Sequence, residues 1–253
     1  MANTYFQFKQ FTVHQERTAM KVCTDACVFG AWVAAKMDLH IPKSMAQNNN
    51  GELLTESTMV LDIGTGTGLL SLMLAQQLSL RVDAVEMDKD AYEQSAGNFK
   101  DSPWAARLSA VHGDIRLFSS TAVKYDIIIS NPPFFENDLK ASGCGRNLAL
   151  HESVLDLREL FRIVALLLSP DGYFALLLPA HRKVQAEQFA AESGMHPCYI
   201  ADVHQSMKHS AFRVMFIFSD RASTAFVEKI NIRNGDHYSP EFVQLLQPYY
   251  LHL

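Results

Sequence analysis

An apolar run that leads directly into three closely spaced glycines is the feature of this sequence that most restricts its fold. Residues 60–68 read Val-Leu-Asp-Ile-Gly-Thr-Gly-Thr-Gly, and a second apolar run follows at 69–78. Glycine lets the backbone turn tightly and lets a ligand approach without a Cβ in the way. The pattern therefore predicts a buried strand, a tight loop and a helix, with a ligand site at the loop.

The rest of the chain alternates strand-like and helix-like segments. Strands are predicted at 58–63, 81–86, 108–112, 125–130, 173–178, 198–203 and 212–218. Helices are predicted at 69–78, 90–99 and 182–193, with one more that Asp156 opens, Glu159 standing at the capping-box position. This alternation predicts an α/β fold with a doubly wound, mostly parallel, seven-stranded sheet. Ligands of such sheets lie beyond the carboxyl ends of the strands, where the loops after the first four predicted strands emerge.

Two segments precede this predicted domain. Residues 6–13 alternate loosely, as a strand or hairpin would, and Thr24 is a plausible N-cap of a short helix that carries Val28, Phe29 and Trp32. The next stretch is polar and contains three consecutive asparagines and a glycine, which indicates a surface loop. We therefore expect a small N-terminal cap at 1–37, a surface loop at 38–57 and the main domain at 58–253.

Composition limits both location and partners. A chain of 253 residues with 48% apolar residues can bury the full core of a single α/β domain. The first ten residues hold no apolar block, and the longest apolar stretch, 160–178, is interrupted by Arg162, Pro170 and Asp171. We therefore expect no signal peptide, no membrane span and a cytoplasmic location. The formal net charge of −5 counts mildly against a nucleic-acid partner, so such a partner requires a local basic patch.

The four cysteines give no sign of a metal site. Cys23, Cys27, Cys144 and Cys198 are scattered, without paired close spacing or a matching array of histidines. Reduced thiols of a cytosolic protein are the better interpretation.

Spacing and charge at the glycine loop indicate its ligand. Dinucleotide sites space their glycines G-x-G-x-x-G, whereas Gly64, Gly66 and Gly68 are spaced G-x-G-x-G. Asp62 stands just before the loop, where its carboxylate would repel a pyrophosphate but would suit a ligand with a cationic ammonium and sulfonium. S-adenosylmethionine carries both groups and is the cofactor that we expect.

Two more acidic residues follow predicted strands at the same edge. Glu86 ends the second strand, about twenty residues after the loop, where a carboxylate can accept hydrogen bonds from both ribose hydroxyls. Asp114 follows the third strand and is expected to accept a hydrogen bond from the adenine amino group of the cofactor. A simple turn aspartate is the alternative interpretation of Asp114.

The fourth predicted strand ends in Asn131-Pro132-Pro133-Phe134, which we expect to be the catalytic loop. Consecutive prolines fix the backbone and leave the Pro132 carbonyl free. An exocyclic amino group on a base is a poor nucleophile, because its lone pair is delocalised into the ring. If the Asn131 side chain and the Pro132 carbonyl each accept one N–H, the lone pair is directed at the methyl donor without a metal, a covalent intermediate or a strong base. Phe134 would stack on the extruded base.

These motifs resemble the N-P-P-[FY] group of class I methyltransferases, which have a Rossmann-like fold and methylate amino groups. The flanks narrow the resemblance to the bacterial tRNA(Val) adenine-37 amino-methyltransferase family. They do so through 11–15, 19–25 and 30–32 in the N-terminal part and through 238–253, which contains Tyr249-Tyr250-Leu251. The resemblance implies an S-adenosylmethionine-dependent tRNA (adenine-N6) methyltransferase. It also implies an N-terminal segment that covers the cofactor, with Lys21 and Thr24 as cofactor contacts beside Asn131.

Other activities share the central motif and remain alternatives. Guanine amino-methylation of ribosomal RNA and glutamine methylation of a protein both use N-P-P-[FY]. DNA methylation is disfavoured, because a separate target-recognition domain would need on the order of a hundred more residues. A monomer is favoured, and the residues that could hold tRNA are basic: Lys140, Arg146, His181, Arg182, Lys183, Lys208, His209 and Arg213.

Overall fold

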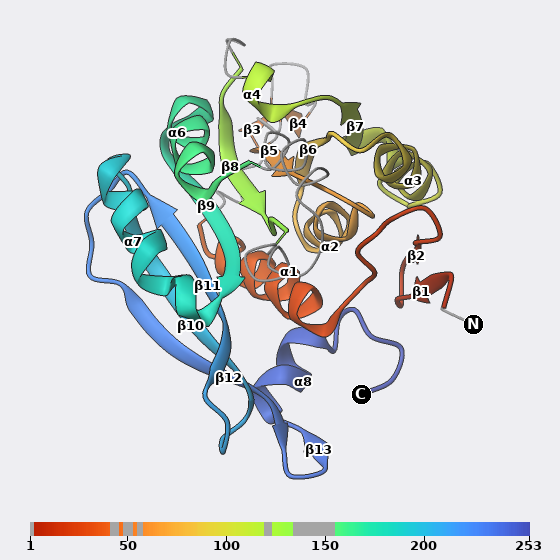
Figure 1. Ribbon diagram of the computed structural model, residues 1–253. Coiled ribbons are helices and arrows are strands. Elements are labelled where there is room, and N and C mark those ends of the chain that lie inside the picture. Colours follow the sequence, from red (N-terminus) through yellow and green to blue (C-terminus); the bar gives the residue numbers. More distant parts are fainter. Residues whose placement is uncertain (1–2, 41–45, 48–52, 55–57, 119–122, 134–154) are drawn as a thin grey trace, which may run out of the picture.

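The fold is built on one central sheet, shown in Figure 1. The computed structural model describes residues 3–40, 46–47, 53–54, 58–118, 123–133 and 155–253. Within these residues the sheet has nine strands in the order β13-β12-β10-β11-β9-β8-β5-β6-β7. The strands are β5 (Thr58–Ile63), β6 (Leu80–Glu86), β7 (Leu108–His112), β8 (Tyr125–Ser130), β9 (Leu168–Pro179), β10 (His196–Ser206), β11 (Ala211–Ser219), β12 (Phe226–Asn234) and β13 (His237–Tyr238).

The sheet is mostly parallel, as predicted. Strands β5 to β9 are parallel to their neighbours among themselves, and β12 is parallel to β10. Strand β11 is antiparallel to both β9 and β10. The bounds predicted for β5, β7 and β8 agree with the structure, and β9 begins before the predicted residue 173.

The predicted number of seven strands was wrong, because β12 and β13 extend the sheet beyond β10. The sequence of β12, Phe-Val-Glu-Lys-Ile-Asn-Ile-Arg-Asn, mixes charged and apolar residues, and only Ile230 and Ile232 of this strand are buried. A strand that buries so little of its surface gives a weak signal in a single sequence.

Helices cover both faces of the sheet, which confirms the doubly wound arrangement. The helices α1 (Thr24–Met37), α2 (Leu69–Gln77), α3 (Lys89–Lys100) and α8 (Pro240–Leu246) supply side chains to one hydrophobic cluster. The other cluster takes side chains from α4 (Ile115–Phe118), α6 (Leu157–Leu167) and α7 (Lys183–Glu192). Asp156 caps α6 by accepting a hydrogen bond from the Glu159 amide at 2.8 Å, as the capping-box spacing predicted. Short 3-10 turns lie at Ala105–Arg107 and Ala180–Arg182.

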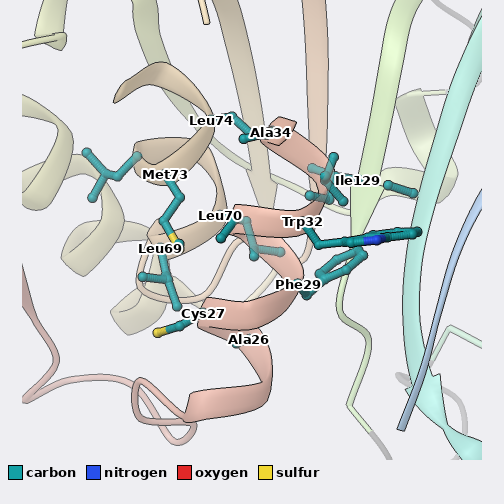
Figure 2. Close-up of a cluster of buried hydrophobic side chains, with 14 of the residues drawn as sticks. Ala26, Cys27, Phe29, Trp32, Ala34, Leu69, Leu70, Met73, Leu74 and Ile129 are labelled. Atoms are coloured by element: carbon teal, nitrogen blue, oxygen red, sulfur yellow. The ribbon is translucent and has the colours of Figure 1, made fainter. Parts of the chain in front are cut away.

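Helix α1 is longer and more deeply buried than the sequence indicated. Cys23 is its N-cap and makes no side-chain cap bond, so the prediction that Thr24 caps the helix was wrong. Figure 2 shows Phe29 and Trp32 of α1 directed toward the strands, while Leu70 and Met73 of α2 pack against the other side of the helix. The proposed division at 1–37, 38–57 and 58–253 stays a prediction. Two short strands, β3 (Ala46–Gln47) and β4 (Leu53–Leu54), pair within its middle segment.

The two ends of the described chain pack together beside α1, as Figure 1 shows. Strands β1 (Tyr5–Gln7) and β2 (Thr12–His14) form a hairpin, one of the two forms that the sequence left open for 6–13. The Lys9 amide donates to the Tyr249 carbonyl at 2.8 Å, and Phe8 forms a β-bridge with Tyr250. The Tyr249 hydroxyl in turn donates to the Met73 carbonyl of α2 at 3.1 Å.

We expect Gly30→Val to lower the free energy of unfolding by about 1–3 kcal/mol, because overpacking a close helix crossing forces its neighbours apart. A Cβ at Gly30 would lie 2.8 Å from the Met73 sulfur. Ala35→Val, at an exposed position of α1, is the matched control and should cost less than about 1 kcal/mol. Denaturant unfolding measures both, and equal losses would contradict the close packing.

Candidate active site

The glycine loop between β5 and α2 adopts a backbone that glycine favours. Gly64, Gly66 and Gly68 have φ values of 72°, 56° and 81°. A Cβ at Gly68 would lie 2.5 Å from the Phe99 ring of α3, so this glycine allows close packing. A Cβ at Gly64 or Gly66 would meet no heavy atom within 4 Å. These two residues therefore leave an open backbone surface of the kind that a closely bound ligand requires.

Asp62 lies beneath this loop and braces it. Its side chain is fully buried, and Oδ2 accepts hydrogen bonds from the hydroxyls of Thr65 and Ser71, both at 2.7 Å. Its Oδ1 is buried without a hydrogen-bond partner. Burial raises the pKa of Asp62 from 3.8 to about 6. At neutral pH the loop therefore stands over a buried negative charge, which favours a cationic ligand.

Glu86 joins the end of β6 to the glycine loop. Its Oε2 accepts from the Gly66 amide at 2.9 Å, and its Oε1 accepts from the Asp88 amide at 3.0 Å. The Gly113 amide donates to the Glu86 carbonyl at 2.9 Å. The loops that follow β5, β6 and β7 are thus all hydrogen-bonded to Glu86.

Asp114 has a partner that the sequence did not reveal. Both of its carboxylate oxygens accept hydrogen bonds from Arg116 Nε, at 2.9 and 2.8 Å. The Arg116 guanidinium holds the pKa of Asp114 below its ordinary value. Asp114 is therefore a fixed carboxylate, and any contact with an adenine amino group would be made beside this ion pair.

Asn131 stands next to the glycine loop because β8 is the neighbour of β5. Ser130 is the register partner of Ile63, and its hydroxyl donates to the Ile63 carbonyl at 2.9 Å. Asn131 and Gly64 therefore directly follow the ends of these two strands. Neighbouring strands of a sheet lie about 4.8 Å apart. The Asn131 Oδ1 is buried and has no hydrogen-bond partner in the described part of the chain. Pro132 is half-buried and Pro133 exposed, whereas Phe134 lies outside the described residues.

The N-terminal segment reaches the same edge but is held by a residue that sequence reasoning missed. Asn98 of α3 is buried and accepts from the His14 amide at 3.0 Å. Its Nδ2 donates to the carbonyls of His14 and Thr67, each at 2.8 Å. One amide side chain therefore links the β1–β2 hairpin to the glycine loop. Only knowledge of the tertiary contact identifies it, because an asparagine on a helix has no local signature.

Lys21 and Thr24 lie in the connection to α1. The Lys21 ammonium donates to the backbone carbonyls of Thr18, at 2.9 Å, and Gln15. Thr24 is exposed at the first turn of α1 and borders a hollow of about 290 Å³. The Lys21 ammonium is thus held by carbonyls of its own connection, and the contact of either residue with a cofactor stays a prediction.

The described part of the chain contains no group of three or more His, Cys, Asp or Glu side chains arranged to hold a metal ion. No helix in the described ranges is both long enough and apolar enough to cross a membrane.

Comparisons with known proteins agree with this arrangement. The methyltransferase small domain family matches residues 19–174. A protein of Cytophaga hutchinsonii named tRNA1(Val) (adenine(37)-N6)-methyltransferase is 38% identical over 256 residues, which cover 100% of both chains. A protein of the same name from Phocaeicola vulgatus is 37% identical over 254 residues, again covering 100% of each.

Solved structures share the fold. A structure described as a predicted O-methyltransferase from Agrobacterium tumefaciens has a TM-score of 0.59 at 15% identity and covers 88% of this chain and 96% of its own. A putative RNA methyltransferase from Pyrococcus horikoshii has a TM-score of 0.52 at 19% identity, with 77% and 82% covered. These likenesses confirm the Rossmann-like methyltransferase fold expected from the sequence.

Asn98→Ala is expected to weaken S-adenosylmethionine binding about tenfold or more and to lower the free energy of unfolding by about 2–4 kcal/mol. The variant leaves backbone groups of His14 and Thr67 without partners, and each such buried group costs about 1–3 kcal/mol. Calorimetric titration and denaturant unfolding measure the two effects. Lys100→Ala, at an exposed position of the same helix, is the control. A variant that binds the cofactor as well as wild type would show that the hairpin and the loop are independent.

Asp62→Asn tests the buried charge through its pH dependence. In the folded protein the pKa of Asp62 is raised from 3.8 to about 6. The contribution of Asp62 to the free energy of unfolding is therefore fully present below about pH 4 and is lost as the pH rises to 6. The variant should therefore gain up to about 3 kcal/mol of stability relative to wild type between pH 4 and pH 7. It should also bind S-adenosylmethionine more weakly, because the negative charge is gone. Unfolding at both pH values measures the gain; if the exposed Asp101→Asn gains as much, burial is not its cause.

Proposed function

Because the chain belongs to the tRNA1(Val) (adenine(37)-N6)-methyltransferase family, within the methyltransferase small domain family, we propose that it methylates the N6 amino group of adenine 37 in tRNA1(Val), with S-adenosylmethionine as the methyl donor. Near full-length similarity to relatives of that name supports the substrate. The proposed chemistry rests on one observation. The Oδ1 of Asn131, just after β8, is buried and has no hydrogen-bond partner among the described residues.

Asn131 orients the amino group. Its Oδ1 accepts one N–H of the exocyclic amine and the Pro132 carbonyl accepts the other, which holds the lone pair along one direction. A buried acceptor without a partner among the described residues is suited to this role, because none of the described hydrogen bonds has to break when the base arrives. Positioning of this kind supplies most of the rate.

The residues around the glycine loop fit S-adenosylmethionine. The cofactor supplies an electrophilic methyl group on a positively charged sulfur. Gly64 and Gly66 leave room for it, and the buried charge of Asp62 favours its cationic groups. Glu86 is already fixed by the Gly66 amide, and its carboxylate has lone pairs left to accept hydrogen bonds from the ribose hydroxyls.

The proposed target is a base that is already unpaired. An adenine beside the anticodon lies in a loop, so its extrusion costs little and a compact chain can manage it without a separate target-recognition domain. Phe134, which lies outside the described residues, is the proposed stacking partner. A tRNA substrate agrees with a cytoplasmic location, and a monomer stays a prediction.

Methylation of a tRNA pool and of a tRNA1(Val) transcript with labelled cofactor tests the proposal. After nuclease digestion, the label should be found in N6-methyladenosine, and a transcript with guanine at position 37 should take up none. Label on guanine or on a protein glutamine would overturn it in favour of the related activities.

Asn131→Ala should reduce methyl transfer about a hundredfold or more, because one preorganised polar contact to the reacting group is lost. Its affinity for S-adenosylmethionine, measured by titration, should fall only modestly. A transfer rate within a few-fold of wild type would show that the loop has a structural role only.

A further inference from the structure

Strands β10, β11 and β12 extend farther past the carboxyl edge than the strands around Asn131. The register places Ser130 opposite Leu176 on β9. The next residue of β9, Leu177, is level with Met215 on β11 and Ala201 on β10. The turn after β10 lies about seven residues beyond this level, which at 3.3 Å per residue is roughly 20 Å. Figure 1 shows these strand ends projecting past the end of β8. We name residues 204–213 and 233–238 the basic wall.

The wall and the cofactor half of the edge carry opposite charge. The wall contains Lys208, Arg213 and Arg233 and one acidic residue, Asp236. Residues 86–90 and 113–116, at the ends of β6 and β7, contain four acidic residues and two basic ones: Glu86, Asp88, Asp90, Asp114, Lys89 and Arg116. Asn131 stands between the two halves, because β8 lies between β5 and β9. A chain with a net charge of −5 therefore still has a basic surface on the edge of the sheet that carries its proposed catalytic residue.

Two of the basic residues in this region hold the fold together. Lys183 donates to both carboxylate oxygens of Asp202 at 3.0 Å. Arg213 Nε donates to Asp25 of α1 at 2.7 Å. Each of these charges already faces an opposite charge in a half-buried pair, so neither is suited to a large share of phosphate binding.

Lys208 and Arg233 are placed differently. Both are exposed, and the turn that carries Lys208 is braced by a 2.8 Å hydrogen bond between the His204 ring and the His209 carbonyl. The Arg233 guanidinium donates to the Asp236 carbonyl at 3.1 Å and lies 5.0 Å from the centre of the Tyr238 ring. The remaining donors of a guanidinium held in this way are preoriented for a phosphate.

The wall faces the start of α1. Arg233 and Tyr238 line the hollow of about 290 Å³ whose other side is formed by Thr24 and Asp25 at the start of α1. Helix α1 begins at the end of the molecule where α2 and the glycine loop meet, as Figure 2 shows for Cys27 and Leu69. A polymer that lies along the wall therefore passes the start of α1, where Thr24 is the expected cofactor contact.

We propose that the basic wall binds the phosphate backbone of the RNA substrate, with Lys208 and Arg233 contacting phosphates while the target base enters at Asn131. This inference rests on the proposed function and adds the surface by which the substrate is held. Phosphate contacts of this kind position a nucleic acid and do not select its bases.

The double variant Lys208→Glu/Arg233→Glu tests the proposal. Binding of the tRNA1(Val) transcript is measured between 50 and 200 mM salt, together with methyl transfer and S-adenosylmethionine titration. The control is Arg81→Glu, which makes the same charge change for one residue at the opposite, amino edge of the sheet. A second double variant, Lys208→Ala/Arg233→Ala, removes the two positive charges without introducing negative ones. Thermal unfolding verifies that each variant is folded.

We expect the RNA dissociation constant of the double glutamate variant to rise tenfold or more. The slope of log affinity against log salt should become shallower by about one for each lost phosphate contact. Cofactor affinity and kcat at saturating RNA should stay within twofold of wild type. RNA binding reduced no more than in Arg81→Glu would overturn the wall as the RNA surface, even where wild type methylates tRNA adenine. Wild type that methylates no tRNA would instead overturn the proposed function.

Discussion

The pairing of β5 with β8 is the constraint on which the site depends. It sets Ile63 opposite Ser130, and the Ser130 hydroxyl fixes the two strand ends to each other. The next residue of each strand is then Gly64 of the glycine loop on one side and Asn131 on the other. A shift of one residue in this register would turn Asn131 to the other face of the sheet. Both strands are buried among apolar neighbours on both faces, which makes such a shift costly.

The buried carboxylate of Asp62 has a cost that function explains better than stability does. Burial opposes its ionisation, as its raised pKa shows, and only one of its oxygens receives hydrogen bonds. An asparagine would satisfy Thr65 and Ser71 without that cost. The charge is therefore best understood as electrostatic preorganisation for a cation, in a place where water cannot screen it. The same reasoning applies to the two halves of the carboxyl edge, for which we propose an acidic half that favours a cationic cofactor and a basic half that binds phosphates.

A structural feature could be predicted from the sequence when neighbouring residues determine it. The bounds of β5, β7 and β8 and the glycine loop were predicted correctly, because apolar runs and tight turns are determined by neighbouring residues. Helix α1 was underestimated, because a helix that is buried on nearly all sides lacks the amphipathic pattern that marks an ordinary one. Strand β12 was missed because it is mostly exposed, and Asn98, Arg116 and Ser71 were missed because their roles exist only through contacts with the folded loops. Basic residues were identified as a group, but the sequence did not show that Asp202 and Asp25 pair with Lys183 and Arg213.

Contacts far from the loop also connect both flanks of the chain to the site. Asn98 joins the N-terminal hairpin to the glycine loop, and the hairpin pairs with the C-terminal tail through Lys9 and Tyr249. The Tyr249 hydroxyl then returns to the Met73 carbonyl in α2, the helix that the glycine loop opens. Hydrogen bonds thus connect the N-terminal hairpin, the C-terminal tail, α2 and the glycine loop to one another. Each flank therefore influences the geometry of the cofactor loop through these contacts.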